Sequence, residues 1–433
     1  MSDAAPTRQV AAGGVNRSRL MVWGGFAIVL LLAPLIFTSS LSHTMLSQMG
    51  IAIIVCLSYN MLLGQGGMLS FGHAAYSGMG SFLAIHTLNM VTKGLPLPVS
   101  LIPIVGGLAS MFFAVLLGWV TTKKSATPFA MITLGVGELV WAMSLMFPEF
   151  FGGEGGVSGN RVAGSKPFGL TYGPQIQLYY LIALYTFVCA CLMFAFTRTP
   201  LGRILNAVRD NPERVEFVGY DTQKVRYFAF VIAAFFAGIS GGLAALNFEI
   251  VTSEVVSGYR SGAYLLFTFL GGATFFFGPI IGAVLMVLAF VLLSELTKAW
   301  LLYLGLIFLF MVMYAPGGVA SLIMMNLRVA AFGKLRSLLL TYAGLALTLL
   351  LALTGAAAMI EMVYHLQLNA ALGSELPFMG LTLDAKSTGS WLGAALLMLL
   401  GMGLFELVRR NFARRWSAIQ ESIEHDLRQR EAH

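Results

Sequence analysis

Charged residues are scarce in this sequence. Asp, Glu, Lys and Arg together make up 10% of the 433 residues, whereas apolar residues make up 58%. Soluble domains carry about 25% charged residues, so this composition excludes a soluble globular protein and indicates a polytopic membrane protein. The 48 glycines agree with that class, because small residues allow the close backbone approach that helix association in lipid requires.

Cysteine is nearly absent as well. The three cysteines, Cys56, Cys189 and Cys191, all lie within apolar runs. Cys189 and Cys191 are two positions apart and therefore point to different faces of a helix. The cysteines indicate neither a disulfide framework nor a metal site, and we expect them to be inert packing residues.

Catalytic and nucleotide-binding motifs are also missing. The histidines and acidic residues are dispersed, and none shows a recognisable nucleophile–base spacing. No Gly-x-x-x-x-Gly-Lys-Ser/Thr phosphate-binding loop occurs. We therefore expect no catalytic residue, no metal site and no cofactor bound by this chain.

Long apolar runs dominate what is present. Each is long enough to cross a bilayer or nearly so, and they lie at about 20–37, 44–63, 72–92, 98–121, 128–148, 178–197, 225–247, 279–297, 299–315, 337–358 and 389–408. The first run has two interpretations, a signal peptide or a span. Its length of about 18 apolar residues and the poor cleavage site at 38–41 favour a span.

The basic residues between these runs are unevenly distributed. With the N-terminus inside, twenty of the 26 Lys and Arg residues fall on one side: Arg8, Arg17, Arg19, Lys123, Lys124, the six of 198–226, Arg328, Lys334, Arg336, Arg409, Arg410, Arg414, Arg415, Arg428 and Arg430. Short loops rich in Lys and Arg stay cytoplasmic, so both termini are predicted to be cytoplasmic. The remaining six are then outside: Lys93, Arg161, Lys166, Arg260, Lys298 and Lys386. The net charge of +7 thus reflects topology, and we expect no nucleic-acid partner.

The sides assigned to the basic loops before and after residues 263–297 predict that these residues leave one face of the membrane and return to the same face. They are too many for one straight helix and too few for two full helices, at about 1.5 Å per residue across about 30 Å of hydrocarbon. We predict a short helix over 263–270, a membrane-buried turn at Gly271-Gly272 and a full helix to 297. Irregular backbone is tolerated in a membrane only beside protein or a water cavity, so this re-entrant hairpin is expected at a subunit interface or beside the transport pathway.

The longest hydrophilic stretch is 198–226, with six basic and four acidic residues. Pro200 can open a helix, and Asn211-Pro212 breaks it before a second short helix that ends at Gly219. The pattern predicts a helix-turn-helix on the cytoplasmic face.

This stretch resembles the coupling loop of M-type permease subunits of branched-chain amino acid ABC importers. The resemblance rests on Gly202-Arg203, Ala207-Val208-Arg209-Asp210-Asn211 and Gly219, and on NMLLGQGGMLSFGHAAYSGMG at 60–80, GGEGGVSG at 152–159, LGGATFFFGPIIGA at 270–283 and APGGVASL at 315–322. It covers about residues 20–325, with its motifs in order. Arg214-Val215 stands where the family's loop is usually Ala-rich, and residues from 326 onward have no counterpart in the family.

The resemblance implies a site and a set of partners. Coupling to the ATPases would fall to Gly202, Arg203, Ala207, Arg209, Asp210, Asn211 and Gly219. The partners would be a second homologous permease, two cytoplasmic ATPase subunits that bind ATP and Mg, a periplasmic substrate-binding protein and the lipid of a bacterial inner membrane. Because Arg203 and Arg209 are not quite on one helical face, one could bind the ATPase while the other anchors the loop.

Together these features predict an all-α polytopic fold. We expect a cytoplasmic tail at 1–19, a permease domain at 20–325 with about ten membrane segments including the re-entrant hairpin, and an extension at 326–433 with two transmembrane helices joined by an outer loop at 359–388. After Leu407, a helix with an Arg cluster and Trp416 is expected to begin at the inner membrane surface. The extension has three open interpretations: attachment to the core, contact with a partner, or lineage-specific decoration.

Small residues recur every fourth position within 233–245, in two adjacent rows: Ala234, Gly238 and Gly242, and Ala233, Ala237, Gly241 and Ala245. Such a face predicts close helix packing. Its partner is either a helix of the same chain or a second permease.

Three polar residues within the apolar runs are candidates for the substrate pathway. Glu138 is the single carboxylate well inside a run, where an acid is costly enough to suggest function; the alternatives are a bond to a neighbouring helix or a shallower position. Ser70 and His73 lie in a Gly-rich stretch that either breaks a helix beside the pathway or packs closely. His86 and Asn89 are explained by interface solvation.

The sequence is expected to encode a permease for branched-chain or other hydrophobic amino acids, and the two alternatives are an ion-coupled secondary transporter and a structural scaffold. An ion-coupled secondary transporter would place several ionisable groups at the midplane, where only Glu138 is a good candidate. A purely structural scaffold would leave the polar Gly-rich breaks unexplained. Related permeases also serve urea, amides or aromatic acids, so the substrate depends largely on the binding protein.

Overall fold

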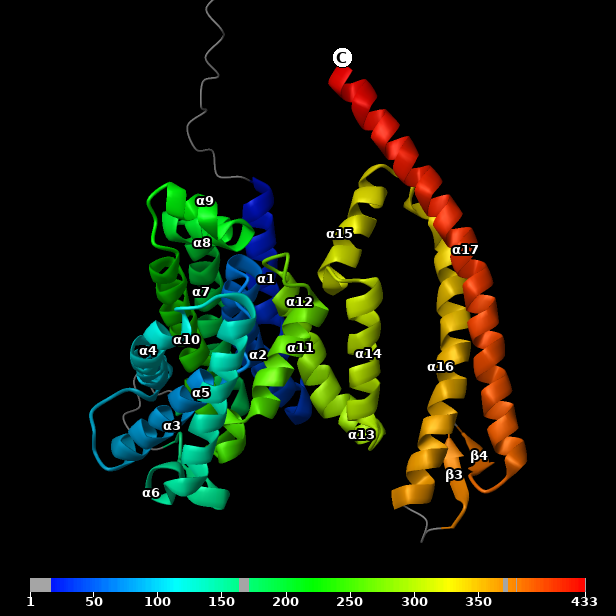
Figure 1. The fold of residues 1–433 in the computed structure, drawn as a ribbon. Helices are drawn as coiled ribbons and strands as arrows, with labels where there is room; N and C mark the ends of the chain where they lie inside the picture. The colour runs from blue at the N-terminus through cyan, green and yellow to red at the C-terminus, as the bar shows by residue number, and fades with distance from the viewer. Residues whose placement is uncertain (1–16, 163–170, 369–372, 379, 433) are drawn as a thin grey trace, which may run out of the picture. The chain divides into compact units, whose positions relative to one another are not determined.

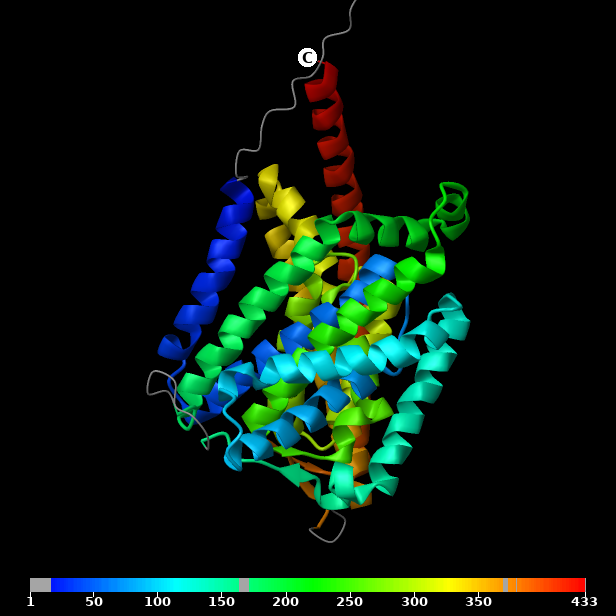
Figure 2. The same cartoon turned by 90° about the vertical axis from the view of Figure 1, so that its left-hand side faces the viewer.

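The computed structural model describes residues 17–162, 171–368, 373–378 and 380–432. Helices dominate these residues (Figures 1 and 2), and the all-α prediction is confirmed. Within them, eight helices are long and apolar enough to cross a membrane, or nine if one bent pair forms a single span. The chain divides into two compact units, Met1–Thr268 and Phe269–His433, which are described separately below. The predicted tail at 1–16 and Lys166 lie outside the described residues.

Unit 1 contains the first eleven α-helices. They are α1 (Arg17–Ile36), α2 (Ser40–Gly66), α3 (His73–Thr92), α4 (Ile102–Thr121), α5 (Ala126–Met146), α6 (Pro148–Phe151), α7 (Gln175–Arg198), α8 (Pro200–Asp210), α9 (Pro212–Phe217), α10 (Thr222–Phe248) and α11 (Gly258–Gly271), whose last residues belong to unit 2. Short 3-10 turns lie at Val99–Leu101, Gly153–Gly155 and Ser253–Val256. The strands β1 (Val157–Ser158) and β2 (Ile250–Val251) form an antiparallel pair that the sequence did not predict.

The small-residue face of α10 packs inside its own chain. A Cβ atom at Gly242 would lie 2.7 Å from Pro103 Cα of α4, and one at Gly80 of α3 would lie 2.7 Å from Gly238 Cα. A Cβ at Gly241 would overlap the carbonyl oxygen of Ser77. These backbones touch because no side chain intervenes, so the face meets α3 and α4 of the same chain, and α10 is the buried centre of unit 1.

His86 and Asn89 bond to the backbone near one end of α3. His86 Nε2 lies 2.7 Å from the Phe150 carbonyl oxygen, and Asn89 Nδ2 donates to the Ser158 carbonyl at 2.9 Å. Interface solvation alone is therefore an incomplete explanation, since both side chains hold the segment that follows α5.

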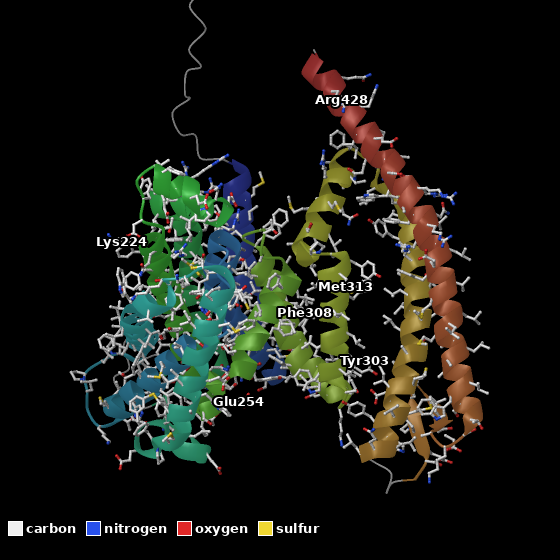
Figure 3. All side chains as sticks on the ribbon, viewed as in Figure 1. Lys224, Glu254, Tyr303, Phe308, Met313 and Arg428 are labelled. Carbon is white, nitrogen blue, oxygen red and sulfur yellow. The ribbon has the colours of Figure 1, made fainter. Side chains whose placement is uncertain are left out.

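Unit 2 contains α12 (Gly278–Leu288), a π-helical segment (Ala289–Leu293), α13 (Ser294–Leu296), α14 (Trp300–Tyr314), α15 (Gly318–Ala331), a 3-10 turn (Leu335–Leu338), α16 (Leu339–Leu368), β3 (Glu375–Phe378), β4 (Leu381–Asp384) and α17 (Thr388–Ala432). Helices α14 and α15 meet at a bend of 50°. Met313 of α14 is 67% exposed (Figure 3), as expected for a helix that faces lipid.

The backbone around Gly271-Gly272 turns sharply, as predicted. Gly272 has φ = 112°, a conformation that favours glycine. A Cβ at Gly271 would overlap the Gly278 carbonyl oxygen, so the two helix ends approach closely. The first helix begins at Gly258, five residues earlier than predicted. Whether the hairpin returns to the same membrane face stays a prediction.

Helices α16 and α17 pack together as the predicted extension. A Cβ at Gly355 would lie 2.5 Å from Met398 N, so the two helices pair through close backbone contact. Tyr303 OH of α14 donates to Glu361 Oε1 of α16 at 3.3 Å, which joins the extension to the preceding helices. The expected outer loop at 359–388 is largely ordered instead: α16 continues to Leu368 and β3 pairs with β4.

Candidate coupling site

The helix-turn-helix predicted in 198–226 is present as α8 and α9, and its ends are fixed by local hydrogen bonds. Thr199 Oγ1 accepts from the Gly202 N–H at 3.2 Å, with Pro200 as the first helical residue. Asn211 Oδ1 caps α9 in the same way at the Arg214 N–H, 3.0 Å away. The predicted end at Gly219 is also observed, with φ = 95°.

One face of α8 is seated against the end of α2. Gly202, Leu205 and Val208 are buried, with Leu205 completely inaccessible. A Cβ at Gly66 would lie 3.2 Å from Leu205 Cδ1. The Gly-rich break after α2 is therefore, at least in part, the seat of α8.

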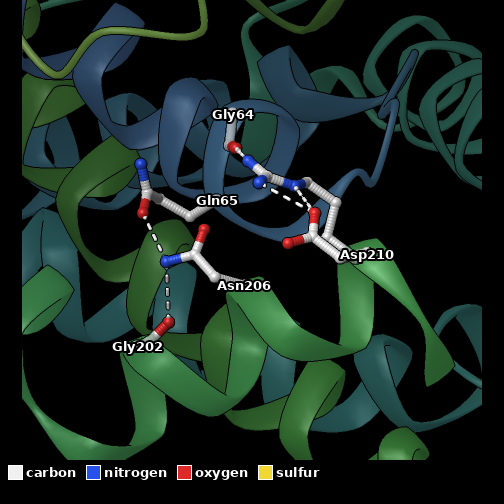
Figure 4. A network of polar contacts seen from close by, with 6 residues as sticks. Gly64, Gln65, Gly202, Asn206 and Asp210 are labelled. Carbon is white, nitrogen blue, oxygen red and sulfur yellow. Dashed lines mark hydrogen bonds and ion pairs between the residues drawn. The ribbon is translucent and has the colours of Figure 1, made fainter. Parts of the chain in front are cut away.

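Polar bonds hold the same contact (Figure 4). Arg209 Nη1 donates to the Gly64 carbonyl oxygen, and Arg209 Nε donates to Asp210 Oδ1 at 2.9 Å. Asn206 Nδ2 donates to Gln65 Oε1 at 2.9 Å. Since the last carbonyls of α2 lack intrahelical partners, the Arg209 guanidinium satisfies one of them and carries charge that suits a helix C-terminus.

The opposite face of α8 is free of such contacts. Arg203 and Ala207 are exposed, and neither makes a side-chain bond among the interactions found in the described chain. The two arginines thus differ in surroundings: Arg209 contacts its own subunit, and Arg203 points to solvent.

The end of α9 carries an exposed apolar tip, which we define as Phe217, Val218 and Tyr220. Their exposed fractions are 89%, 75% and 48%. Sequence reasoning missed this tip, although the apolar run FVGY inside an otherwise hydrophilic stretch was a usable signal. Large apolar side chains exposed together mark a surface that contacts another protein or the membrane.

Ser70 and His73 lie in the interior of unit 1. His73 Nε2 is 3.0 Å from Ser58 Oγ, which donates to the Ala233 carbonyl at 2.7 Å. Tyr59 OH donates to the Ser70 carbonyl at 2.8 Å. Ser70 is 0% exposed and His73 is 1% exposed. Ser70 Oγ and His73 Nδ1 have no hydrogen-bond partner among the described residues, so close packing alone does not explain these two side chains. Their role in the pathway stays a prediction.

Glu138 lies near the middle of α5 and is exposed. A Cβ at Gly258 would lie 2.9 Å from Glu138 Oε1, so this carboxylate sits against the first residue of α11. The neighbouring Gly137 packs on Gly72 of the Gly-rich break. The structure does not bring Glu138 together with α8, and the candidate pathway and coupling residues form two separate groups. Within the described residues, no three His, Cys, Asp or Glu side chains are grouped to hold a metal ion.

Comparison with known proteins decides the family. Residues 42–316 match the family model described as "Branched-chain amino acid transport system / permease component". The chain belongs to this family. The high-affinity branched-chain amino acid transport system permease protein LivM of Escherichia coli (strain K12) is 27% identical to this permease over 289 residues, which cover 62% of this chain and 67% of that protein.

The LivM protein of Salmonella typhimurium (strain LT2) is similar to this permease to the same extent, with 28% identity over 293 residues, 62% of this chain and 67% of that protein. No solved structure matches the chain significantly. The family match begins within α2 and ends before α15, so it is shorter at both ends than the predicted resemblance over about 20–325. The absence of a family counterpart from 326 onward stays a prediction.

Proposed function

We propose that this permease is the transmembrane subunit of an ATP-binding-cassette importer that moves branched-chain, or other hydrophobic, amino acids from the periplasm to the cytoplasm. It works with a second homologous permease, two cytoplasmic ATPase subunits that bind ATP and Mg, and a periplasmic substrate-binding protein. The chain itself is a transport component, and hydrolysis belongs to the ATPases.

One observation carries the proposal beyond family membership. Helix α8 is seated on the end of α2 through Leu205, Asn206 and Arg209, while Arg203 and the apolar tip remain exposed. A motion of another protein reaches the membrane only through an element that is fixed to the spans on one side and accessible on the other. The α8–α9 element meets both conditions.

The test is co-purification and transport. The permease, expressed with the proposed partner subunits and a tag on this chain only, should retain two ATPases per permease pair and take up leucine into proteoliposomes only when ATP is enclosed on the ATPase side. Uptake driven by an ion gradient without ATP would instead support the secondary-transporter alternative.

The substrate is tested on the binding protein. We expect that partner to bind leucine, isoleucine or valine more tightly than urea, a short amide or phenylalanine in calorimetry. The reverse order would assign this permease to one of the other substrate classes served by related permeases.

A further inference from the structure

Arg161 makes an unusually complete set of hydrogen bonds at the end of α10 that lies away from the coupling loop. Nη1 donates to the carbonyls of Leu246 and Asn247, both at 3.2 Å. Nε donates to the Tyr172 carbonyl at 2.8 Å, and Nη2 donates to the Gly173 carbonyl at 3.1 Å. The guanidinium therefore caps the last turn of α10 and binds the segment before α7 at once.

Three further bonds complete this group, which we call the Arg161 clasp. The Arg161 backbone N–H donates to Glu249 Oε1 at 2.8 Å, and Nη2 also donates to Gln175 Oε1 at 3.2 Å. Gln175 Nε2 in turn donates to Asn247 Oδ1 at 2.8 Å. All five guanidinium donors have acceptors in a planar fork that lysine cannot reproduce.

The clasp also holds two unfavourable backbone conformations. Tyr172 has φ = 53° and Glu249 has φ = 56°, two of the three non-glycine residues with positive φ in the described chain. Such conformations persist only where surrounding contacts impose them, and they cluster at sites that switch or bind. Arg161 bonds to both residues, to Tyr172 through its side chain and to Glu249 through its backbone N–H. It shares this role with Gln177, which accepts from the Tyr172 N–H, and with Gly159, whose N–H donates to the Glu249 carbonyl.

Helix α10 connects the clasp to the coupling loop. Asp221 directly follows the α8–α9 element and caps α10 through the Lys224 N–H at 3.1 Å, a bond that holds the pKa of the Asp221 carboxyl below its usual value. The helix continues unbroken to Phe248. In Figure 3, Lys224 in the first turn of α10 and Glu254 in the 3-10 turn that follows the helix lie toward opposite ends of unit 1.

We propose that Arg161 is a positioning residue for transport, which fixes the far end of α10 to the outer segment, here the described residues 157–162 and 171–175. A helix whose backbone touches α3 and α4 moves as a rigid rod, so a shift imposed at the coupling loop reaches the clasp, and docking of the binding protein on the outer segment is transmitted back. This inference rests on the proposed function, because it requires ATPases at one end of α10 and a binding protein at the other.

The experiment compares ATP hydrolysis by the full complex in nanodiscs with and without leucine-loaded binding protein. In Arg161→Ala we expect stimulation to fall about tenfold, the size of a typical coupling between sites, with basal hydrolysis unchanged. Lys93→Ala is the matched control, because Lys93 is an exposed basic residue at the end of α3 and its loss should leave stimulation intact. Arg161→Lys should fall between Ala and wild type.

A covalent replacement for the clasp separates a mechanical role from direct contact with the binding protein. Ser158 and Ile250 are opposed across β1 and β2 and both are exposed, and such pairs have Cα separations suited to a disulfide. Ser158→Cys/Ile250→Cys in the Arg161→Ala background should restore stimulation when oxidised and lose it again when reduced.

Two results would overturn the inference: full stimulation in Arg161→Ala, or an oxidised disulfide that forms without restoring it. If Arg161→Ala yields no complex, Arg161→Lys takes its place in the same comparison. A wild-type complex that lacks ATPases or stimulation would refute the proposed function instead, before any variant is compared.

Discussion

At the residue scale, the two arginines of α8 have different surroundings, so substitutions at the two positions should have different effects. Arg203 is exposed, whereas Arg209 binds the Gly64 carbonyl of α2. Charge reversal of an exposed interface residue turns attraction into repulsion, which can cost several kcal/mol. Loss of a charged hydrogen bond costs about 1.5 kcal/mol, and here it loosens the seat of α8.

We therefore expect Arg203→Glu to leave the permease in the membrane with unchanged thermal stability but to lose the ATPases on purification. Arg203→Lys, which keeps the charge, should retain them.

Arg209→Ala should lower the melting temperature of the isolated permease, and Arg203→Glu/Arg209→Glu should lose both the ATPases and substrate-stimulated hydrolysis. A double variant that binds ATPases at full stoichiometry and transports normally would remove α8 as the coupling element.

Glu138 should contribute to transport beyond folding. An intramembrane carboxylate costs a few kcal/mol. The Glu138 side chain is exposed, and its carboxylate lies next to Gly258 at the start of α11. Glu138→Gln should lower leucine uptake while the yield of assembled complex stays unchanged. Glu149→Gln, at the exposed start of α6, serves as the control. Normal uptake by the Glu138 variant would return this residue to a structural role.

At the scale of elements, the end of α9 carries an apolar tip that the coupling residues implied by the family resemblance did not include. Phe217→Ser/Val218→Ser should change the stability of the permease by less than about 0.5 kcal/mol, because both side chains are largely exposed. If the tip inserts into the ATPase, the loss of such an anchor costs about 2 kcal/mol, a roughly thirtyfold weaker ATPase affinity in a titration. An unchanged affinity would leave α8 alone as the contact.

The elements that were predicted accurately are those set by local sequence. Apolar runs predicted the long helices of unit 1 to within about four residues, and Pro200, Asn211-Pro212 and Gly219 predicted α8 and α9. The apolar runs at 337–358 and 389–408 predicted the ends of α16 and α17 wrongly, because these helices continue past the runs to Leu368 and Ala432. The Arg161 clasp could not be predicted, because a guanidinium that binds backbone carbonyls from distant segments leaves no pattern in side-chain identity. The β3–β4 hairpin was missed because it is only eight paired residues within a stretch that also reads as loop.

The coupling site was predicted in position but not in contact. Spacing alone left open which arginine anchors the loop, since helical geometry places Arg203 and Arg209 on different faces of α8 but does not say which face meets the spans. Only the position of α2 decides that Arg209 meets Gly64. For the same reason, the sequence did not identify the helix that packs on the small-residue face of α10. A row of small residues predicts close approach by another helix, but it does not identify that helix.

At the scale of the whole molecule, the path of the chain across the membrane is testable at the hairpin that begins with α11. With the three native cysteines removed, Gly258→Cys and Lys298→Cys should both react with a membrane-impermeant maleimide added from outside. This follows if residues 263–297 leave and return to one face. Labelling of position 298 only from the cytoplasmic side would contradict the topology, and Lys124→Cys provides the internal reference.

Helix α17 is longer than one membrane crossing requires. Its 45 residues extend about 68 Å at roughly 1.5 Å per residue, whereas the hydrocarbon layer is about 30 Å thick. More than half of the helix therefore stands clear of the bilayer, on the side predicted to be cytoplasmic. The projecting part is comparable in length to the diameter of a small domain, so a soluble protein that approaches the predicted cytoplasmic side of unit 2 meets this helix before it reaches the bilayer.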